Sequence, residues 1–331
     1  MSENNKETKK KAGVGAWLKA HAKDLAAYGG LVLCIVIFSV IPPMFGQSLW
    51  TGEKLSTLMS DVIVTALMSV GAVFVYALGN MDISIGGQVG VYATLMVLLG
   101  NSTGSLIPGI VLSLVIAVAI GVINGATGEI LKIHPIIPSL VFMMVLNGTR
   151  SIIYTKLGSR NTSLASIDYS IFKQPLVMLV VLVIELLIVA FLFNYTRFGK
   201  NAKAIGANPV VAAQCGINIV TYKAVCYVIM GLCVVVAAIF QMGYTGSASD
   251  ATGTGFEMNV MVALILGGMP LSGGMSAKVS CAIIGAFTYS LLDVGLPMIG
   301  VPNNMTFLIK AIIFIAVVLI TCRKKGGTLP R

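Results

Sequence analysis

Charged side chains are scarce in this sequence. Asp, Glu, Lys and Arg make up 10% of the 331 residues, whereas 57% are hydrophobic and the mean hydropathy is +0.94. Soluble domains carry about 25% charged residues, so this composition excludes a soluble fold. A membrane-spanning helix needs about 20 apolar residues, and the polar interruptions divide the chain into about ten such segments. The sequence therefore predicts an all-α, polytopic membrane protein.

Motifs for catalysis and nucleotide binding are also absent. The chain has no Gly-x-x-x-x-Gly-Lys-Ser/Thr loop, no nucleophile elbow, no HExxH string and no paired carboxylates of the catalytic kind. This excludes a P-loop ATPase and argues against an intramembrane hydrolase. The six cysteines lack CxxC spacing, which argues against a disulfide framework or a metal site. We therefore expect no enzymatic activity, no cofactor and no metal in this chain.

The positive charges are unevenly distributed. Lys and Arg cluster at the N-terminus, in the loop after Arg197 and at the C-terminus. Such clusters orient membrane proteins with the basic loops inside, and they do not resemble a nucleic-acid-binding surface. They predict a cytoplasmic N-terminal tail (1–25), a transmembrane domain (26–322) and a cytoplasmic basic tail (323–331). The expected spans are 26–45, 56–79, 84–99, 105–123, 131–150, 175–196, 220–242, 257–270, 277–295 and 303–322.

The loop 196–219 is the longest polar interruption in the second half of the chain. Asn208 is a good N-cap and Pro209 suits the first helical position, so a short helix from Pro209 to Cys215 is expected outside the bilayer. A segment this small cannot bury a core of its own, and we expect it to dock on a cytoplasmic partner. An ordinary basic connector between two spans is the alternative.

Two glycine-rich strings interrupt the spans. GNMDISIGGQVG begins at Gly79, and the related GGMPLSGGM begins at Gly267, which indicates an internal duplication. Broken membrane helices have this composition and border transport paths. Asp82 is then expected to cap the helix that follows. Tight turns between packed spans are the alternative.

Four ionisable residues fall inside or near the ends of the expected spans. They are Asp61, Glu185, Asp293 and Lys310. An unpaired charge at the centre of a bilayer costs about 3 kcal/mol, so we expect Lys310 to pair with Glu185 or Asp293. The longest external segment, 151–174, is expected to be either a receiving surface for a soluble partner or a solvated linker.

Several ordered motifs carry a family resemblance. TRFGKNAKAIGANPVVAAQCGI resembles the coupling segment of permease subunits of ribose-type sugar ABC importers, within the sugar and branched-chain amino-acid permease superfamily. GNMDISIGG and TGFEMNVMVALILGGMPLSGG are similar to two further signatures of these permeases, and the similarity runs from about residue 60 to 320. The resemblance implies a type II ABC importer fold. The sequence departs from the family pattern at Asn80, Asn259 and Met269-Pro270, which leaves the sugar open.

The resemblance assigns two sets of site residues. The ATPase-coupling set is Gly199, Ala204, Gly206, Asn208, Pro209, Ala212, Ala213 and Gly216. The interrupted spans and the resemblance together give the translocation-path set, which is Asn80, Asp82, Ser84, Gly86, Glu257, Asn259 and Ser272.

The resemblance also implies partners and a location. The chain would form a homodimer in the bacterial cytoplasmic (inner) membrane, contact lipid, and work with cytoplasmic ABC ATPase subunits that bind ATP and Mg²⁺. An extracytoplasmic solute-binding protein would deliver a monosaccharide, and no nucleic acid would take part. The alternatives are a nucleoside or branched-chain amino-acid ABC permease, a stand-alone ion-coupled carrier and, last, a membrane scaffold.

Overall fold

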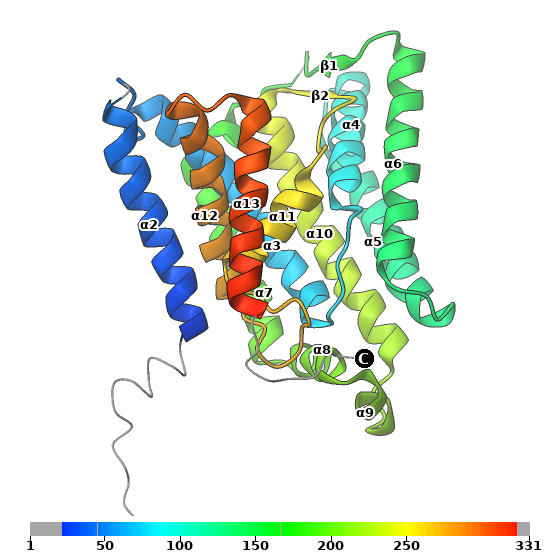
Figure 1. The fold of residues 1–331 in the computed structure, drawn as a ribbon. Coiled ribbons are helices and arrows are strands. Elements are labelled where there is room, and N and C mark those ends of the chain that lie inside the picture. The colour runs from blue at the N-terminus through cyan, green and yellow to red at the C-terminus, as the bar shows by residue number, and fades with distance from the viewer. Residues whose placement is uncertain (1–21, 45, 166, 323–331) are drawn as a thin grey trace, which may run out of the picture.

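The computed structural model describes residues 22–44, 46–165 and 167–322, and this part of the chain is almost entirely helical (Figure 1). The expected tails 1–21 and 323–331 lie outside the described residues. The helices are α2 (Ala22–Met44), α3 (Gly52–Ala77), α4 (Ile85–Thr103), α5 (Ile107–Ile130), α6 (Ile136–Leu157), α7 (Pro175–Asn194), α8 (Arg197–Ala207), α9 (Pro209–Gln214), α10 (Ile219–Thr245), α11 (Phe256–Leu266), α12 (Ser280–Met298) and α13 (Asn303–Cys322). The prediction of an all-α polytopic membrane protein is confirmed.

Each of the ten expected spans overlaps one of these helices, although α5 extends seven residues beyond its expected end and α6 begins five residues later than expected. Among the described residues, seven helices are both long and apolar enough to cross a membrane: α2, α3, α5, α6, α7, α10 and α12. Of the other three, α11 and the apolar part of α13 (Met305–Leu319) are shorter, and α4 begins with a polar and glycine-rich turn. α2 starts at Ala22, four residues before the expected span, although its apolar run begins at Ala27.

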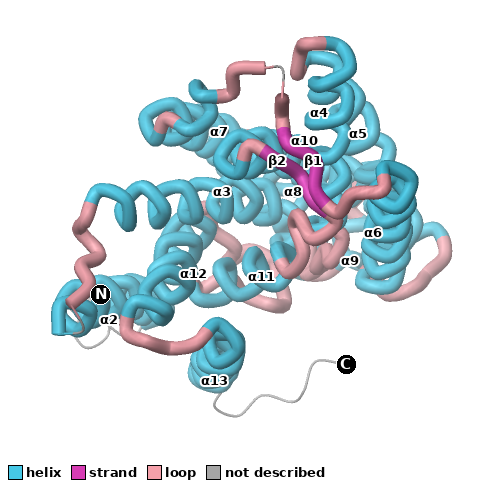
Figure 2. Tube along the Cα trace, turned by 90° about the horizontal axis from the view of Figure 1, so that it is seen from above, coloured by secondary structure: helices cyan, strands magenta, loops and turns pink. Residues whose placement is uncertain are grey.

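α3 is the central helix of the bundle. Its run from Val62 to Ala77 is buried without interruption. α10, α12, α7 and α11 all pack on it, and seen from above it passes between α7 on one side and α11 and α12 on the other (Figure 2). The peripheral helices α2, α5, α6, α7 and α13 instead expose large apolar side chains, as helices that face lipid do. The core of the protein therefore surrounds α3.

Glycines bring two of the longest helices into backbone contact. A β-carbon at Gly121 in α5 would lie 2.7 Å from the Cα of Val228, and one at Gly125 would lie 2.6 Å from the Cα of Ala224. Glycines four residues apart form one small-residue face, which is how membrane helices approach closely. α5 and α10 consequently form the most extensive helix pair in the described part of the chain.

The two interrupted spans end in the same way. After α3 and after α11, one amide bonds to the carbonyl three residues back and the next amide to the carbonyl five residues back. The first of these amides belongs to Gly79 (φ 75°) in one break and to Gly268 (φ 88°) in the other. This left-handed helix ending favours glycine. String matching in the sequence pairs Gly79 with Gly267, whereas the backbone pairs it with Gly268, one residue later.

A small ordered cap lies at the end of the bundle opposite α8 and α9 (Figure 1). It contains the described strands, β1 (Asn161–Ser163) and β2 (Ser247–Ser249), which pair antiparallel with Asn161 opposite Ser249. The short 3-10 helix η1 (Ser170–Lys173) follows β1 in the segment 151–174. Much of the segment 151–174 therefore has defined structure, and β1 joins it to the loop after α10.

Candidate coupling and translocation site

The predicted coupling loop folds into two helices. The expected short helix is α9, in which Pro209 is the first residue and the side-chain oxygen of Asn208 accepts hydrogen bonds from the amides of Val210 (3.0 Å) and Val211 (3.2 Å). The structure adds α8, which sequence reasoning missed. Thr196 caps it by accepting a hydrogen bond from the amide of Gly199 at 3.4 Å.

α8 has one buried face. Gly199, Ala202 and Ile205 are buried, and Lys200 on the other face is exposed. A β-carbon at Gly199 would overlap the carbonyl oxygen of Phe193, so this glycine permits the sharp turn from α7 into α8. The signal that could have revealed α8 is the capping residue Thr196 followed by apolar residues at helical spacing.

The far end of α8 rests on the end of α3. A β-carbon at Gly206 would overlap the carbonyl oxygen of Ala77 and would lie 2.8 Å from the amide nitrogen of Gly274. That same carbonyl accepts a hydrogen bond of 2.8 Å from the amide of Gly274. Ala77 is the last residue of α3, and Gly274 lies in the loop between α11 and α12. Gly206 therefore contacts both interrupted spans at one point.

The two interruptions also contact each other directly. A β-carbon at Gly273 would lie 2.5 Å from the carbonyl oxygen of Ala77 and 2.7 Å from that of Tyr76. One at Gly79 would lie 3.0 Å from the carbonyl oxygen of Ser272. Only glycine fits here, because Gly79 and Gly273 also have positive φ angles of 75° and 64°. The repeated glycine strings thus form one backbone junction next to α8.

Aromatic rings hold α8 to the bundle. Phe198 lies against Phe74 of α3, with ring centroids 5.4 Å apart, and Phe74 also meets Phe193 of α7 edge to face at 5.2 Å. Lys203 places its ammonium group 4.1 Å from the ring centroid of Phe193, and partial burial lowers the pKa of this lysine. The aromatic cluster therefore fixes α8 between the ends of α3 and α7.

The predicted coupling residues divide into two groups. Gly199 and Ala212 are buried, and Ala204 and Gly206 are half-buried against the protein. The exposed members are Asn208, Pro209, Ala213 and Gly216. They surround two apolar side chains that sequence reasoning did not select, Val210 (65% exposed) and Val211 (50% exposed). Two neighbouring exposed valines on a polar segment form an apolar patch at the tip of α9, outside the helix bundle.

A buried polar chain starts at Asp82. One carboxyl oxygen of Asp82 accepts hydrogen bonds from the amide (2.7 Å) and the hydroxyl (2.6 Å) of Ser84, and the other accepts one from the side-chain amide of Asn124 (3.2 Å). Gln88 donates to the Ser84 hydroxyl at 2.8 Å, and the Tyr92 hydroxyl donates to Gln88 at 3.1 Å. Asp82 thus binds an amide at the start of α4, as expected. The spacing of Ser84, Gln88 and Tyr92 by four residues could have revealed the rest of the chain.

Gly86 and Glu257 meet on another face of α4. A β-carbon at Gly86 would overlap the carboxyl group of Glu257 at the start of α11. One turn further, a β-carbon at Gly90 would overlap the guanidinium group of Arg150, which donates to the carbonyl oxygen of Thr252. Arg150 is 4% exposed and was not predicted as a site residue. The glycine face of α4 therefore lies against one anionic and one cationic side chain.

Asn259 belongs to a third cluster. Its side-chain oxygen accepts a hydrogen bond of 2.5 Å from the hydroxyl of Tyr289, which accepts one of 3.0 Å from Lys310. Lys310 also forms an ion pair with Asp293. Of the two partners expected for Lys310, the structure therefore selects Asp293 and leaves Glu185 elsewhere.

The seven predicted translocation-path residues are thus not one constellation. Asn80, Asp82 and Ser84 are buried inside the protein, with at most 8% of each exposed. Gly86 meets Glu257, Asn259 joins the Lys310 cluster, and Ser272 is exposed beside the glycine junction. The groups that remain partly accessible are therefore Glu257, Asn259 and Ser272.

Known proteins resemble this chain over most of its length. Residues 54–318 match the family described as "Branched-chain amino acid transport system / permease component". The ribose import permease protein RbsC of Escherichia coli is 27% identical over 318 residues, which cover 94% of this chain and 96% of that protein. The galactose/methyl galactoside import permease protein MglC of Escherichia coli is 30% identical over 311 residues, 87% of this chain and 90% of that protein.

A further relative is the autoinducer 2 import system permease protein LsrC of Shigella flexneri. It is 27% identical over 293 residues, which cover 87% of this chain and 84% of that protein. No solved structure matches the chain. Because the family match extends over most of the helix bundle described above, the chain belongs to the family of branched-chain amino acid transport system permease components.

Proposed function

We propose that this chain is the membrane-spanning permease subunit of a binding-protein-dependent ABC importer for a monosaccharide, a ribose-like sugar. A separate ATPase subunit would supply the driving force. The ribose and galactose permeases among the relatives support the sugar. The observation that carries the proposal is the contact of Gly206 with the carbonyl oxygen of Ala77 and the amide of Gly274, because it joins the coupling segment to both interrupted spans.

The proposed coupling runs from α9 inward. The exposed patch of Val210 and Val211 docks on the ATPase, which binds ATP and Mg²⁺. Closure of the ATPase pair moves α9 and, through it, α8. The Gly206 contact has no room to absorb this movement, so the end of α3 and the 272–274 loop shift together.

The proposal assigns the two ends of the bundle to two partners. The end with α8 and α9 carries Arg197, Lys200 and Lys203 and faces the cytoplasm, with both termini on that side. The end with β1 and β2 faces outward and receives the solute-binding protein (Figure 1). Two copies of the permease form a homodimer around the path in the bacterial inner membrane.

A branched-chain amino acid is the second candidate solute. The specific observation in its favour is that Arg150 and Glu257 both reach the glycine face of α4, so a cation and an anion lie along one helix. A zwitterion needs such complementary charges, whereas a sugar needs hydroxyls and amides. Sugar remains the primary proposal because the relatives named above include permeases for ribose and galactose.

Reconstituted transport tests the proposal. The permease, with the ATPase and binding protein encoded beside it, is placed in liposomes, and uptake of labelled pentoses, hexoses, nucleosides and leucine is compared. We expect ATP-dependent uptake of one monosaccharide, and we expect Val210→Asp to abolish ATPase binding without altering the folded permease. Full transport by the permease alone would contradict the proposal and indicate an ion-coupled carrier.

A further inference from the structure

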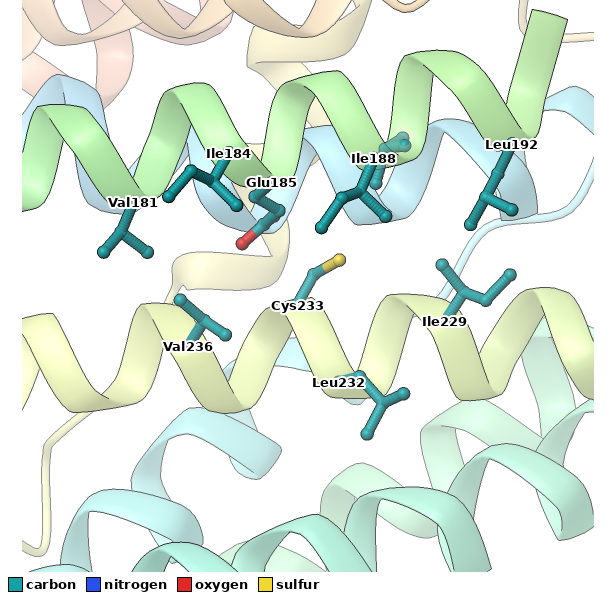
Figure 3. Close-up of a pocket in the computed structure, with 10 residues that line it drawn as sticks. Val181, Ile184, Glu185, Ile188, Leu192, Ile229, Leu232, Cys233 and Val236 are labelled. Atoms are coloured by element: carbon teal, nitrogen blue, oxygen red, sulfur yellow. The ribbon is translucent and has the colours of Figure 1, made fainter. Parts of the chain in front are cut away.

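An apolar groove lies between α7 and α10, within the membrane-spanning part of the bundle. Its volume is about 310 Å³, and its lining consists of aliphatic side chains, one thiol and one carboxyl group (Figure 3). A volume of this size is at the lower end of those that bind small molecules. Ile184 and Ile188 on its rim are 52% and 55% exposed, so the groove opens on the face of α7 that we assign to lipid.

Glu185 is the carboxyl group in this groove. It lies near the middle of α7 and points toward Cys233, which lies near the middle of α10 (Figure 3). Both of its carboxyl oxygens are buried, and neither accepts a hydrogen bond of good geometry from any described residue. The residue itself is half-exposed, so its methylene groups account for the exposure. The Cys233 thiol interacts with the carboxyl group, but a thiol is a weak donor.

The floor of the groove is the contact between α3 and α10, and it is too tightly packed to bring a hydrogen-bond partner to the Glu185 carboxyl group. A β-carbon at Gly71 in α3 would lie 2.6 Å from the β-carbon of Cys233 and 3.2 Å from the Cα of Met230. α3 and α10 are thus in contact directly below the groove. Lys310, the cation that the sequence offered as a partner for Glu185, forms its ion pair with Asp293 instead. Glu185 therefore remains a hydrogen-bonding group without a full partner at mid-membrane depth.

A buried carboxyl group without a hydrogen-bond partner destabilises the folded protein unless a bound molecule supplies the partner. A buried polar group without a hydrogen bond loses its hydration without compensation, and an ionised one loses far more, so the carboxyl group keeps its proton. We propose that the groove between α7 and α10 is a binding site, entered from the bilayer, for apolar molecules that carry one hydrogen-bonding group. The carboxyl group of Glu185 forms a hydrogen bond with that group. The site is separate from the coupling helices and from the buried Asp82 chain.

A lipophilic carbodiimide is a suitable probe, because dicyclohexylcarbodiimide has two apolar rings joined by an N=C=N group whose nitrogens can accept a proton. The proton of the Glu185 carboxyl group passes to one nitrogen, and the carboxyl oxygen adds to the central carbon to give an O-acylisourea. In the absence of water the acyl group then migrates to the other nitrogen and forms a stable N-acylurea. Every atom of acid and reagent is retained, so no leaving group or co-reactant is needed.

The experiment treats membranes that contain the full-length protein and locates adducts by mass spectrometry. We expect one adduct in the peptide that contains Glu185, and we expect its loss in Glu185→Gln, which retains the shape of the side chain. Ile229→Trp is a second variant, which leaves the carboxyl group intact but fills the groove, and it should also lose the adduct. A water-soluble carbodiimide should label the exposed Glu53 and not Glu185.

Competition between the carbodiimide and unreactive apolar molecules tests whether Glu185 recognises a polar group on the bound molecule. A long-chain alcohol should slow the labelling of Glu185 at about a fivefold lower concentration than the alkane of equal length, the factor that one net hydrogen bond supplies. Equal competition by the alkane would overturn the role of Glu185. Absence of the adduct in folded wild-type protein would overturn the site, whether another chain covers the groove or the carboxyl group is inaccessible. None of these readouts depends on the transported solute, so the proposed function can fail while this site stands.

Discussion

The ring of Phe198 in α8 stacks on the ring of Tyr222 in α10, with centroids 5.5 Å apart and planes inclined by 15°. The hydroxyl of Tyr222 also accepts a hydrogen bond of 2.7 Å from the side-chain amide of Asn201, one turn further along α8. Two different interactions therefore fix α8 to the first turn of α10. Because α10 packs along α3 and α5, a displacement of α8 reaches the centre of the bundle by a second route.

Substitutions of Tyr222 separate these two interactions. Tyr222→Phe removes only the hydrogen bond and should lower the free energy of unfolding by about 1 kcal/mol. Tyr222→Ala removes the stacked ring as well and should cost about 3 kcal/mol. Thermal unfolding of the purified protein measures both values. If the ring contact transmits movement, Tyr222→Ala should also reduce transport per ATP hydrolysed, and equal coupling in both variants would contradict this route.

Gly206 offers the sharpest test of the coupling contact. Gly206→Leu places a side chain where the carbonyl oxygen of Ala77 already lies, so α8 must move away from the glycine junction. We expect loss of uptake, together with ATP hydrolysis that no longer responds to solute. The matched control is Gly148→Leu in α6, because a β-carbon at Gly148 has no neighbour within 4 Å. Normal uptake and normal ATPase stimulation in Gly206→Leu would show that the loop 196–219 only connects two spans and does not couple ATP hydrolysis to transport.

The prediction of α9 was correct because its signal is local: Asn208 caps amides only two and three residues ahead, and Pro209 occupies the first helical position. α8 was missed because Phe198, Ala202 and Ile205 are thinly spread among basic and polar residues. The contact between Gly206 and Ala77 has no local signal at all, since the two residues lie far apart in the chain. Lys310 shows the same limit: its depth in the membrane can be predicted from the sequence, but the choice between Glu185 and Asp293 as its partner depends on which way each helix faces.

The orientation of the coupling helices can be tested with a native residue. Cys215 is the C-cap of α9 and is exposed, whereas Cys34 is partly buried and Cys226, Cys233 and Cys281 are buried. A membrane-impermeant maleimide should therefore label Cys215 in inside-out vesicles and not in intact cells, because the proposed function places the loop in the cytoplasm. Cys215→Ser should remove the label. Labelling of Cys215 in intact cells would place the loop outside and end the proposal of ATPase docking.

Asp82 should matter far more than the acidic residue of the external segment. Asp82→Ala leaves the Ser84 amide and the Asn124 side chain without an acceptor in a buried site, which should lower the free energy of unfolding by about 2 to 4 kcal/mol. Asp82→Asn keeps one acceptor and should cost less. Asp168 is the control, because it is exposed and bonds only locally, accepting a hydrogen bond from the amide of Ser170 at 2.9 Å.

The pH dependence of Asp168 serves as an internal check on this comparison. The hydrogen bonds from Ser170, chiefly from its amide, lower the pKa of Asp168 below its usual value. A carboxyl group with a lowered pKa stabilises the folded state above the unfolded pKa of about 4 and loses this effect as the pH falls through the folded value. Asp168→Ala should therefore slightly lower stability above about pH 4, and its difference from the wild type should disappear as the pH falls through the folded pKa. Similar mild effects of Asp82→Ala and Asp168→Ala at neutral pH would remove Asp82 from the site.

Lys310 and Asp293 should be tested as a pair. Lys310→Met removes the cation that pairs with Asp293. The lysine is buried but the Asp293 side chain is 36% exposed, so the cost should be below the roughly 3 to 5 kcal/mol of a fully buried pair. Tyr289 also loses the donor to its hydroxyl, so α13 should detach from α12 before the rest of the bundle unfolds. The double variant Lys310→Met with Asp293→Asn should recover most of the lost stability, because no unpaired charge remains. Hydrogen exchange of α13 and the unfolding temperatures of the wild type and the two variants measure this coupling. If the double variant is as unstable as Lys310→Met alone, the lysine acts through its packing and the ion pair contributes little.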